Sequence, residues 1–364
     1  MAVWEDWNEC AACTPWTVGI EEEVMLLSPE SWLPAEIADC ARAETHGSAL
    51  ELATTPHATV GGSVAQLASL RTALAETLEQ LGVRAAVAGT HPTARWEHVE
   101  VSPGARYRYV HASMRELARR EPTFGLHVHV AVPDPERAVR ALNAIRSRLP
   151  LLLALSGNSP IWQGRDSGLA SARTPAFQVF PRTGPPRGFR DYAEYVEAID
   201  VLLRSDAIPE PTFLWWDARL QPTFGTLEVR IMDAQTRVED TAAIAALVQC
   251  LVRTESDAAT EPPEVLSENR FIAARDGMAS ELMVAPDWRR RPIADILEEM
   301  LEACTPVARE LDCVAELGHV PALAALPGAT RQREMADRAG SLEGLVEALS
   351  DDFAREAAES SLAA

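Results

Sequence analysis

The sequence predicts an α+β fold, and three observations indicate it. Short apolar runs interrupted by single charged or histidine residues indicate strands in the first two thirds of the chain. Two of these runs, 213–220 and 226–232, are separated by Gln-Pro-Thr-Phe-Gly, which predicts a β-hairpin. The last third consists mostly of segments with apolar residues at helical spacing. A sheet with a hairpin, followed by a mainly helical region, is typical of α+β proteins.

The other elements follow from residue spacing and from helix start and stop signals. Leucines three and four residues apart predict a helix over 63–81, and Gly82 marks its end. An Asp-Pro pair at 134–135 supplies an N-cap and a first-turn proline for a helix that runs towards Leu149. The remaining expected strands are 17–27, 49–53, 83–88 and 123–132, and the remaining expected helices are 105–120, 192–203, 239–254, 268–280, 293–312 and 341–358.

No boundary divides the chain into two globular halves. Residues 156–188 are rich in Gly, Pro, Ser and Arg and predict a long irregular loop, and such loops are commonly functional. The acidic, proline-containing segment 257–267 is expected to be a surface loop. We expect residues 1–15 to form a poorly ordered N-terminal segment and residues 16–364 to form a single domain.

Composition excludes several classes of protein. The chain has 364 residues, of which 47% are hydrophobic, so a large core is available. A formal net charge of −21 argues against nonspecific binding to nucleic acid or to anionic membranes. No apolar run approaches the roughly 20 residues that a membrane span requires. The N-terminus is acidic and lacks the order of a signal peptide, so we expect a cytoplasmic protein.

The basic residues of the chain are all arginines, because the sequence contains no lysine. This excludes mechanisms that need a Walker A lysine, a Schiff-base lysine, a nucleotidyl-lysine or a carbamylated lysine. The six cysteines do not have the spacing of a small disulfide framework. Cys10 and Cys13 form one C-x-x-C pair, for which a zinc or redox role and a lightly packed segment without such a role are the alternatives.

Three successive glutamates lie in the expected strand 17–27. Side chains alternate along a strand, so Glu21 and Glu23 share one face and Glu22 lies on the other. Like charges on a buried face repel and are costly to desolvate, so an arginine or a bound cation must compensate them. A pair of carboxylates suits a hard divalent cation such as Mg²⁺. The alternative is an exposed edge strand with solvated charges.

Other apolar strands carry polar residues in the same way. His127 and His129 share one face, which is either a metal-site geometry or a hydrogen-bonded histidine pair in the core. Glu228 and Arg230 also share a face, as a structural ion pair or as a metal ligand beside a clamp for phosphate or carboxylate. Glu51 interrupts another apolar run. One polar cavity on the face of a sheet explains these four places better than four independent accidents.

A series of motifs in fixed order resembles the bacterial carboxylate–amine ligase family, also called glutamate–cysteine ligase type 2. The main motifs are Gly19-Ile20-Glu21-Glu22-Glu23, Leu50-Glu51-Leu52-Ala53-Thr54, Gly89-Thr90-His91-Pro92, Phe124-Gly125-Leu126-His127-Val128-His129-Val130 and Phe224-Gly225-Thr226-Leu227-Glu228-Val229-Arg230. Shorter ones are Ser159-Pro160, Phe180-Pro181, Gly184-Pro185 and Asn269-Arg270-Phe271. The resemblance runs from about residue 16 to the C-terminus, and the ordered set is specific.

The resemblance implies a glutamine-synthetase-like catalytic fold: a curved, mainly antiparallel sheet with helices behind it and the active site on its open face. It also implies ATP and Mg²⁺ (or Mn²⁺) as cofactors. Such enzymes phosphorylate a substrate carboxylate, usually the γ-carboxylate of glutamate. An amine, such as that of cysteine, then displaces phosphate, so that the products are γ-glutamylcysteine, ADP and phosphate. The partners would be small-molecule substrates, and whether the chain forms a homodimer is left open.

The resemblance also implies residue roles. The metal ligands would be Glu21, Glu23, Glu51 and Glu228. The catalytic residues would be Arg230, as a clamp for phosphate or acyl-phosphate, and His127, in preference to His129 as a contact to metal or nucleotide. Nucleotide or substrate would be bound by His129, Arg173, Arg270 and Arg275, and the alternative for the three arginines is that they are ordinary surface residues. Phosphoryl transfer needs positioning and charge neutralisation more than a protein nucleophile, so a lysine-free chain can perform it.

Two rival hypotheses make different predictions. A metal-dependent amidohydrolase with a TIM barrel could use His127 and His129, but it needs further downstream histidines, and only His319 follows. A non-catalytic sensor would bind ATP and an amino acid without turnover. The intact set of acidic ligands counts against the sensor.

Overall fold

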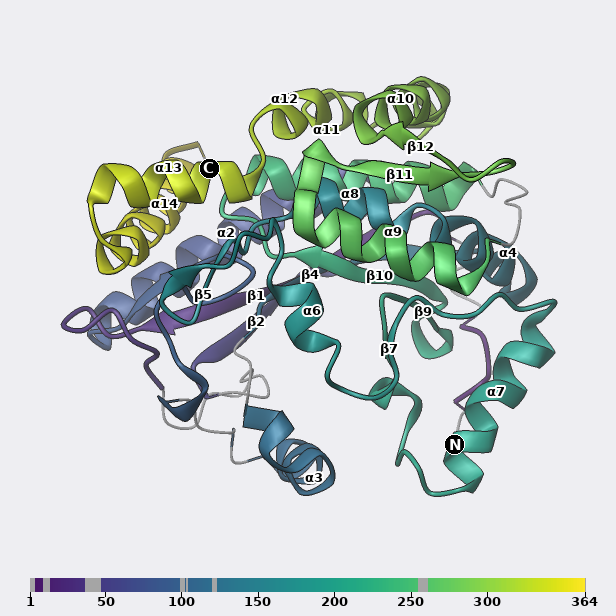
Figure 1. Cartoon of the computed structure of the whole chain (residues 1–364), viewed down its shortest axis with the longest axis horizontal. Helices are drawn as coiled ribbons and strands as arrows, with labels where there is room; N and C mark the ends of the chain where they lie inside the picture. Colours follow the sequence, from purple (N-terminus) through teal and green to yellow (C-terminus); the bar gives the residue numbers. More distant parts are fainter. Residues whose placement is uncertain are drawn as a thin grey trace.

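The computed structural model describes residues 4–8, 14–36, 47–98, 102, 104–119, 123–254 and 261–363, and Figure 1 shows their arrangement. A six-stranded sheet lies at its centre. The strands are β1 (Val18–Leu27), β2 (Ala49–Ala53), β3 (Arg84–Ala86), β4 (Gly125–Ala131), β9 (Ala218–Gln221) and β10 (Thr226–Asp233). Their order is β2-β1-β4-β10-β9, with β3 pairing with the end of β1, and every pairing is antiparallel.

The strands expected at 17–27, 49–53, 83–88, 123–132 and 226–232 are therefore confirmed. The hairpin between β9 and β10 is confirmed as well, with Gly225 in the left-handed conformation at its turn. The other expected strand of this hairpin, 213–220, is interrupted. Its residues Trp215–Trp216 form β8 and pair with β7 (Thr183–Gly184), whereas only the later residues join the main sheet.

Helices cover one face of the sheet. Residues of β1 alternate, and Val18, Ile20 and Val24 are buried on the covered face. Helix α2 (Val60–Gln80) packs against β1, and α8 (Val238–Thr254) packs against β4. Burial of these apolar faces is the main term that holds the two layers together.

The start of one helix agrees with its sequence signal, and the start of another differs. Asp134 caps α4 (Pro135–Arg146) by accepting a hydrogen bond from the Arg137 amide at 2.9 Å. Thr59 caps α2, so that helix begins three residues earlier than expected. Helix α4 ends at Arg146, before Leu149. A separate helix, α5 (Leu149–Ser156), follows, and it has a proline in its first turn.

The expected irregular loop 156–188 contains several short elements. They are β5 (Ile161–Trp162), β6 (Arg165–Asp166), α6 (Arg173–Phe177) and β7. The 3₁₀ turns of the chain are Trp96–His98, Arg115–Arg119, Pro211–Phe213, Pro222–Phe224 and Gly277–Ala279. In Figure 1, α3 (Ala105–Met114) and α7 (Tyr192–Arg204) lie along the lower side of the molecule. The helix expected at 105–120 thus ends early and continues as a 3₁₀ turn.

The C-terminal third is mainly helical, as expected. Its elements are α9 (Pro263–Asp276), β11 (Glu281–Val284), β12 (Arg289–Pro292), α10 (Ile293–Glu310), α11 (Val314–Leu317), α12 (Val320–Ala325), α13 (Gly328–Ala339) and α14 (Leu342–Ala363). Helices α10–α14 lie along the upper side of the molecule in Figure 1. The expectation of a surface loop at 257–267 is wrong from residue 263 onwards, because α9 begins there, at a first-turn proline, Pro263.

Part of the N-terminal segment is packed against the domain. The Trp4 indole donates to Asp200 at 3.1 Å, the Trp7 indole donates to the carbonyl of Val132 at 3.0 Å, and the Asn8 amide donates to the carbonyl of Pro222 at 2.9 Å. The expected poor order of residues 1–15 stays a prediction, and the pair Cys10 and Cys13 lies outside the described residues. Within the part of the chain that the structure describes, the helices are too short or too polar to cross a membrane.

Candidate active site

Strand register brings the acidic and histidine residues together. Glu23 lies opposite Glu51 on β2, Glu21 lies opposite His127 on β4, and His129 lies opposite Glu228 on β10. Directly opposite residues of antiparallel strands point to the same side of the sheet. Ligand atoms of Glu21, Glu51 and His127 lie within 4.8 Å of one another, as do those of Glu21, His129 and Glu228. We call these six residues the carboxylate–histidine cluster.

Glu22 points to the opposite face, where its carboxylate is fully buried. Arg71 of α2 donates to it through Nε at 2.8 Å and through Nη2 at 2.6 Å. The alternative of an exposed edge strand is wrong, because β1 lies between β2 and β4 and its middle glutamate needs a buried partner. The strand therefore carries a structural carboxylate on one face and two cluster carboxylates on the other.

Contacts within the carboxylate–histidine cluster leave one ring nitrogen of His127 without a partner. His127 Nδ1 lies 3.1 Å from Glu21 Oε2, and His129 Nδ1 lies 3.0 Å from Thr226 Oγ1. His129 Nε2 lies 3.4 Å from Glu21 Oε1. His127 Nε2 is buried, has no hydrogen-bond partner among the described residues, and lies 3.9 Å from Glu23 Oε1. A buried polar atom without a partner is costly, so this atom fits a site that a ligand completes.

Two carboxylates of the cluster, Glu21 and Glu228, are ionised at neutral pH. Burial alone would raise the pKa of Glu21, but hydrogen bonds and charges from His127 and His129 hold that pKa well below its usual range. Burial would also raise the pKa of Glu228, and the charges of Arg219 and Arg230 outweigh it, so that this pKa is strongly lowered.

The pKa values of the two histidines shift in opposite directions. Burial, together with the nearby charge of Arg230, lowers the pKa of His127. Burial acts the same way on His129, but Glu228 and Glu21 outweigh it and raise its pKa. His127 is therefore the neutral imidazole of the pair. Because Nδ1 of His127 contacts Glu21, its other ring nitrogen, Nε2, is the one placed to bind a metal ion.

Glu228 is held by cations in this structure. Arg219 Nε donates to its Oε2 at 2.6 Å, Gln221 donates to the same oxygen at 2.8 Å, and Arg230 donates to its Oε1. Arg230 Nη1 also lies 3.3 Å from His127 Nδ1. Arg219 was not among the residues expected from sequence. The feature that could have identified Arg219 is the register of the β9–β10 hairpin, which places it opposite Glu228.

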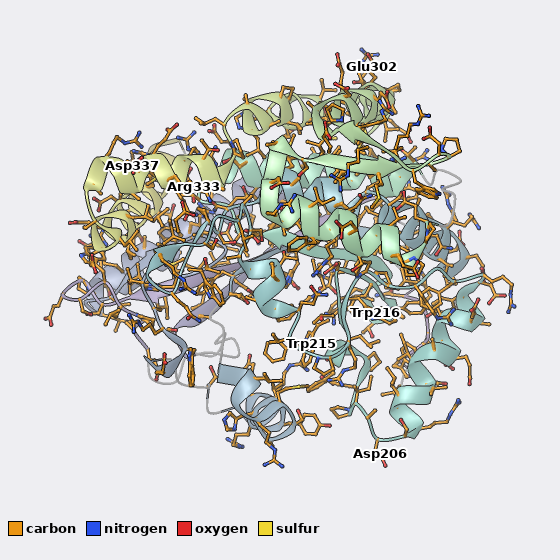
Figure 2. The ribbon with its side chains drawn as sticks, in the orientation of Figure 1. Asp206, Trp215, Trp216, Glu302, Arg333 and Asp337 are labelled. Carbon is orange, nitrogen blue, oxygen red and sulfur yellow. The ribbon has the colours of Figure 1, made fainter. Side chains whose placement is uncertain are left out.

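A narrow pocket lined by arginines, with a volume of only about 10 Å³, adjoins the cluster on the side of Arg230. Its walls are formed by Arg173, Thr174, Phe177, Trp215, Trp216, Asp217, Arg230, Ile231 and Arg270. Figure 2 shows Trp215 and Trp216 towards the middle of the molecule, away from Glu302 and Asp337 at its outer edge. Arg270 forms a two-point ion pair with Asp217, at 2.7 and 3.1 Å. Asp217, like Arg219, was missed by the sequence analysis, and it follows the two tryptophans directly.

The structure does not bring Arg275 into this group. Its guanidinium is exposed and pairs with Asp276 at 2.7 Å. Arg270 and Arg275 lie five residues apart on α9, which places them about 140° apart around the helix axis. One of these two arginines therefore faces the arginine-lined pocket and the other faces away.

An apolar cavity of about 410 Å³ adjoins the cluster on its other side. Glu21 and His129 form part of its wall, and Ala53, Pro56 and Phe224 supply apolar surface. The Phe224 side chain is 59% exposed although it is large and apolar. Its ring lies 6.2 Å from the His129 ring, edge to face. The cluster is thus flanked by an apolar cavity on one side and by the arginine-lined pocket on the other.

Solved ligases have the same fold. A glutamate–cysteine ligase of Francisella tularensis, in complex with AMP, aligns with a TM-score of 0.67 over 98% of this chain and 94% of its own, at 12% identity. A bifunctional glutathione synthetase of Pasteurella multocida aligns with a TM-score of 0.68 over 94% of this chain, at 16% identity. The chain spans about half of that protein, namely 53%. The glutamine-synthetase-like fold with a mainly antiparallel open sheet is confirmed.

Sequence comparison narrows this class to one family. Residues 17–352 match the model described as Glutamate-cysteine ligase family 2 (GCS2). A Rubrobacter xylanophilus protein provisionally named glutamate–cysteine ligase 2-3 is 39% identical over 354 residues, which cover 93% of this chain and 98% of that protein. The chain belongs to glutamate–cysteine ligase family 2.

Family membership makes the chain an ATP-dependent carbon–nitrogen ligase that acts on small molecules. Ligases of this class use ATP and a divalent metal ion. The amidohydrolase alternative is wrong, because it requires a closed parallel barrel and the central sheet is open and antiparallel.

Proposed function

We propose that the protein joins a carboxylate to an amine by way of an acyl-phosphate, with glutamate and cysteine as substrates and γ-glutamylcysteine, ADP and phosphate as products. One observation carries the proposal. The carboxylate–histidine cluster lies between an apolar cavity and the arginine-lined pocket, so apolar surface, oxygen ligands and guanidinium groups, the three kinds of group that a nucleotide base, a metal ion and an anion require, lie next to one another.

The cluster fits divalent metal ions. Glu21, Glu23, Glu51 and Glu228 supply oxygen ligands, which Mg²⁺ and Mn²⁺ both accept. The free Nε2 of His127 supplies a nitrogen ligand beside them. Held by these residues, such ions would supply positive charge that offsets the charge developing on the phosphates during transfer.

Arginines of the chain would handle the remaining negative charge. Arg230 contacts both Glu228 and His127, so its guanidinium can be shared between Glu228 and an incoming phosphate or carboxylate. Arg173 and Arg270 enter the same pocket from the loop and from α9. We assign this pocket to the carboxylate substrate and its acyl-phosphate.

The apolar cavity suits the base of the nucleotide. It is large enough for a planar ring, and the exposed Phe224 offers a face on which such a ring can stack. This placement directs the phosphates across Glu21 and His129 towards Arg230. The amine substrate attacks without a covalent protein intermediate, since the chain has no lysine and no cysteine of the described residues lines either cavity.

Phosphate release over a panel of acids and amines tests the proposal. We expect ADP and phosphate to form only when ATP, Mg²⁺, an acid and an amine are all present, with glutamate and cysteine as an active pair. Glu23→Gln should remove this activity, and Glu30→Gln, at an exposed position beyond β1, should retain it. ATP binding without product for any pair would support the sensor and overturn the ligase proposal.

A further inference from the structure

The end of β10 carries a buried carboxylate that the proposed chemistry does not use. Asp233 is fully buried, and three groups of the 156–188 loop donate to it. The Asn158 amide donates to Oδ2 at 2.9 Å, the Ser159 hydroxyl donates to Oδ2 at 2.6 Å, and the Ser171 hydroxyl donates to Oδ1 at 2.9 Å. One side chain therefore holds two separate stretches of the same loop.

These two stretches position Arg173 at the arginine-lined pocket. Ser159 Oγ, which donates to Asp233, also accepts a hydrogen bond from the Arg173 amide at 3.1 Å. Ser171 lies two residues before Arg173 and pairs with Ser159 in a parallel bridge. The position of the Arg173 backbone is thus set through the two serines that Asp233 binds.

Arg173 itself is a buried cation without a carboxylate partner. Its Nη1 and Nη2 donate only to the carbonyls of Ile231 and Arg230, at 3.2 and 3.3 Å, and its Nε is buried without a partner. Within the described part of the chain it forms no ion pair. Burial lowers its pKa, as expected of a cation whose charge is not fully compensated. An anionic group of a substrate would supply the missing partner.

Two glycines leave the space that this arrangement needs. A Cβ at Gly89 would lie 2.6 Å from Cγ of Asp233, and a Cβ at Gly125 would lie 2.4 Å from Nη2 of Arg173. Gly89 and Gly125 belong to two of the sequence motifs. The first of these close approaches is at Asp233 and the second is at Arg173.

We propose that Asp233 is a positioning residue for the ligase reaction: through Ser159 and Ser171 it sets the loop that holds Arg173 where the carboxylate substrate binds. The inference rests on the proposed function, since it concerns the same pocket. It predicts that loss of the Asp233 hydrogen bonds weakens binding of the carboxylate substrate and leaves binding of the nucleotide largely unchanged.

Steady-state kinetics with the active pair found in the panel test this inference. Asp233→Asn keeps the shape of the side chain but offers one acceptor oxygen in place of two. We expect KM for the carboxylate to rise roughly 10- to 100-fold, the scale for a misplaced binding group, with KM for ATP changed by less than about twofold. Ser171→Ala should move the same parameter in the same direction. Ser167→Ala is the matched control, because Ser167 bonds to the Pro160 carbonyl in the same loop at 2.8 Å and does not contact Asp233.

A double-mutant cycle separates positioning from general loosening of the fold. If Asp233 acts through Arg173, then Asp233→Asn should add little to the rise in KM already caused by Arg173→Gln. Should Asp233→Asn fail to fold, the Ser171→Ala and Arg173→Gln cycle carries the same test. An unchanged KM for the carboxylate, or effects that simply multiply, would overturn the inference while the ligase proposal stands. A wild-type chain that turns over no pair would overturn both.

Discussion

Glu22 and Glu23 are neighbours on β1, and glutamine substitution at each should have opposite consequences. Glu22→Gln removes one charge of an ion pair in which both side chains are almost completely buried. Arg71 would keep Glu356 at 2.7 Å and the carbonyls of Gln235 and Thr236 at 2.8 and 3.0 Å. These contacts limit the damage but leave the guanidinium less well compensated.

The size of the Glu22 effect can be worked from these contacts. Breaking a buried ion pair costs about 3–5 kcal/mol. Arg71 retains several partners, and glutamine still offers one acceptor, so we expect the lower end, about 3 kcal/mol. With an unfolding entropy of about 2.1 cal/mol/K per residue, a chain of 364 residues has ~0.76 kcal/mol/K in total. The melting temperature should therefore fall by about 4 °C, with turnover nearly unchanged.

Glu23→Gln should have the reverse effect. Its Oε2 accepts a hydrogen bond from the Gly125 amide at 2.6 Å, and its other oxygen faces His127. Loss of this negative ligand should reduce turnover by roughly 10²-fold or more. Stability without metal should stay the same or rise, because repulsion among the cluster carboxylates is relieved.

Both variants are measured by urea unfolding in the absence of metal and by phosphate release with ATP and Mg²⁺, with Glu30→Gln as the surface control. The reasoning would be refuted if Glu22→Gln lost turnover at unchanged stability, or if Glu23→Gln unfolded more easily and kept its turnover. Either result would mean that the two faces of β1 are assigned the wrong way round.

Three further predictions follow from the same geometry. Arg230→Lys should lower kcat by roughly 10²-fold, because an ammonium group cannot reproduce the guanidinium fork; a loss of thermal stability with unchanged kcat would favour a purely structural ion pair with Glu228. Excess chelator should abolish phosphate release, and added Mg²⁺ or Mn²⁺ should restore it; turnover that persists in chelator contradicts the metal site. Burial lowers the pKa of His91 to about 4, below the roughly 6.5 of the unfolded chain. Between these values the unfolded state binds the additional proton, so stability should fall by up to about 3 kcal/mol as pH drops from 6.5 to 4. Urea unfolding at both pH values should show a smaller loss in His91→Gln, and an identical loss would contradict the assignment.

The parts of the fold that sequence predicted are those with a clear period or a clear cap. Strand β1 and helix α2 have apolar residues at the spacing of two and of three to four, and Asp134 marks the start of α4. Hairpin β11–β12 was not expected, since one of its strands is Arg289–Pro292, which has no apolar alternation. Helices α11 and α12 are too short for a periodic signal.

In the candidate site too, local features could be predicted from the sequence and long-range pairing could not. Alternation along a strand predicted that Glu21 and Glu23 share a face, and that His127 and His129 do. It could not predict the register that sets Glu21 opposite His127, since register depends on pairing between strands that are about a hundred residues apart.

Long-range partners were also beyond local reasoning. Arg71 reaches Glu22 from a helix 49 residues further along the chain, and nothing in the local sequence of either residue identifies the other. Asp217 pairs with Arg270 over 53 residues in the same way. The sequence could name Arg173 as a candidate. The hydrogen bonds that link its backbone to Asp233 through Ser159 are visible only in the folded loop.

Transfer of labelled oxygen tests the central claim most directly. An acyl-phosphate route requires that one oxygen of the substrate carboxylate leaves with the phosphate. With glutamate carrying ¹⁸O in its γ-carboxylate, together with cysteine, ATP and Mg²⁺, we expect labelled phosphate and ADP in proportion to γ-glutamylcysteine. Release of AMP and pyrophosphate, or of unlabelled phosphate alongside the amide product, would contradict the account.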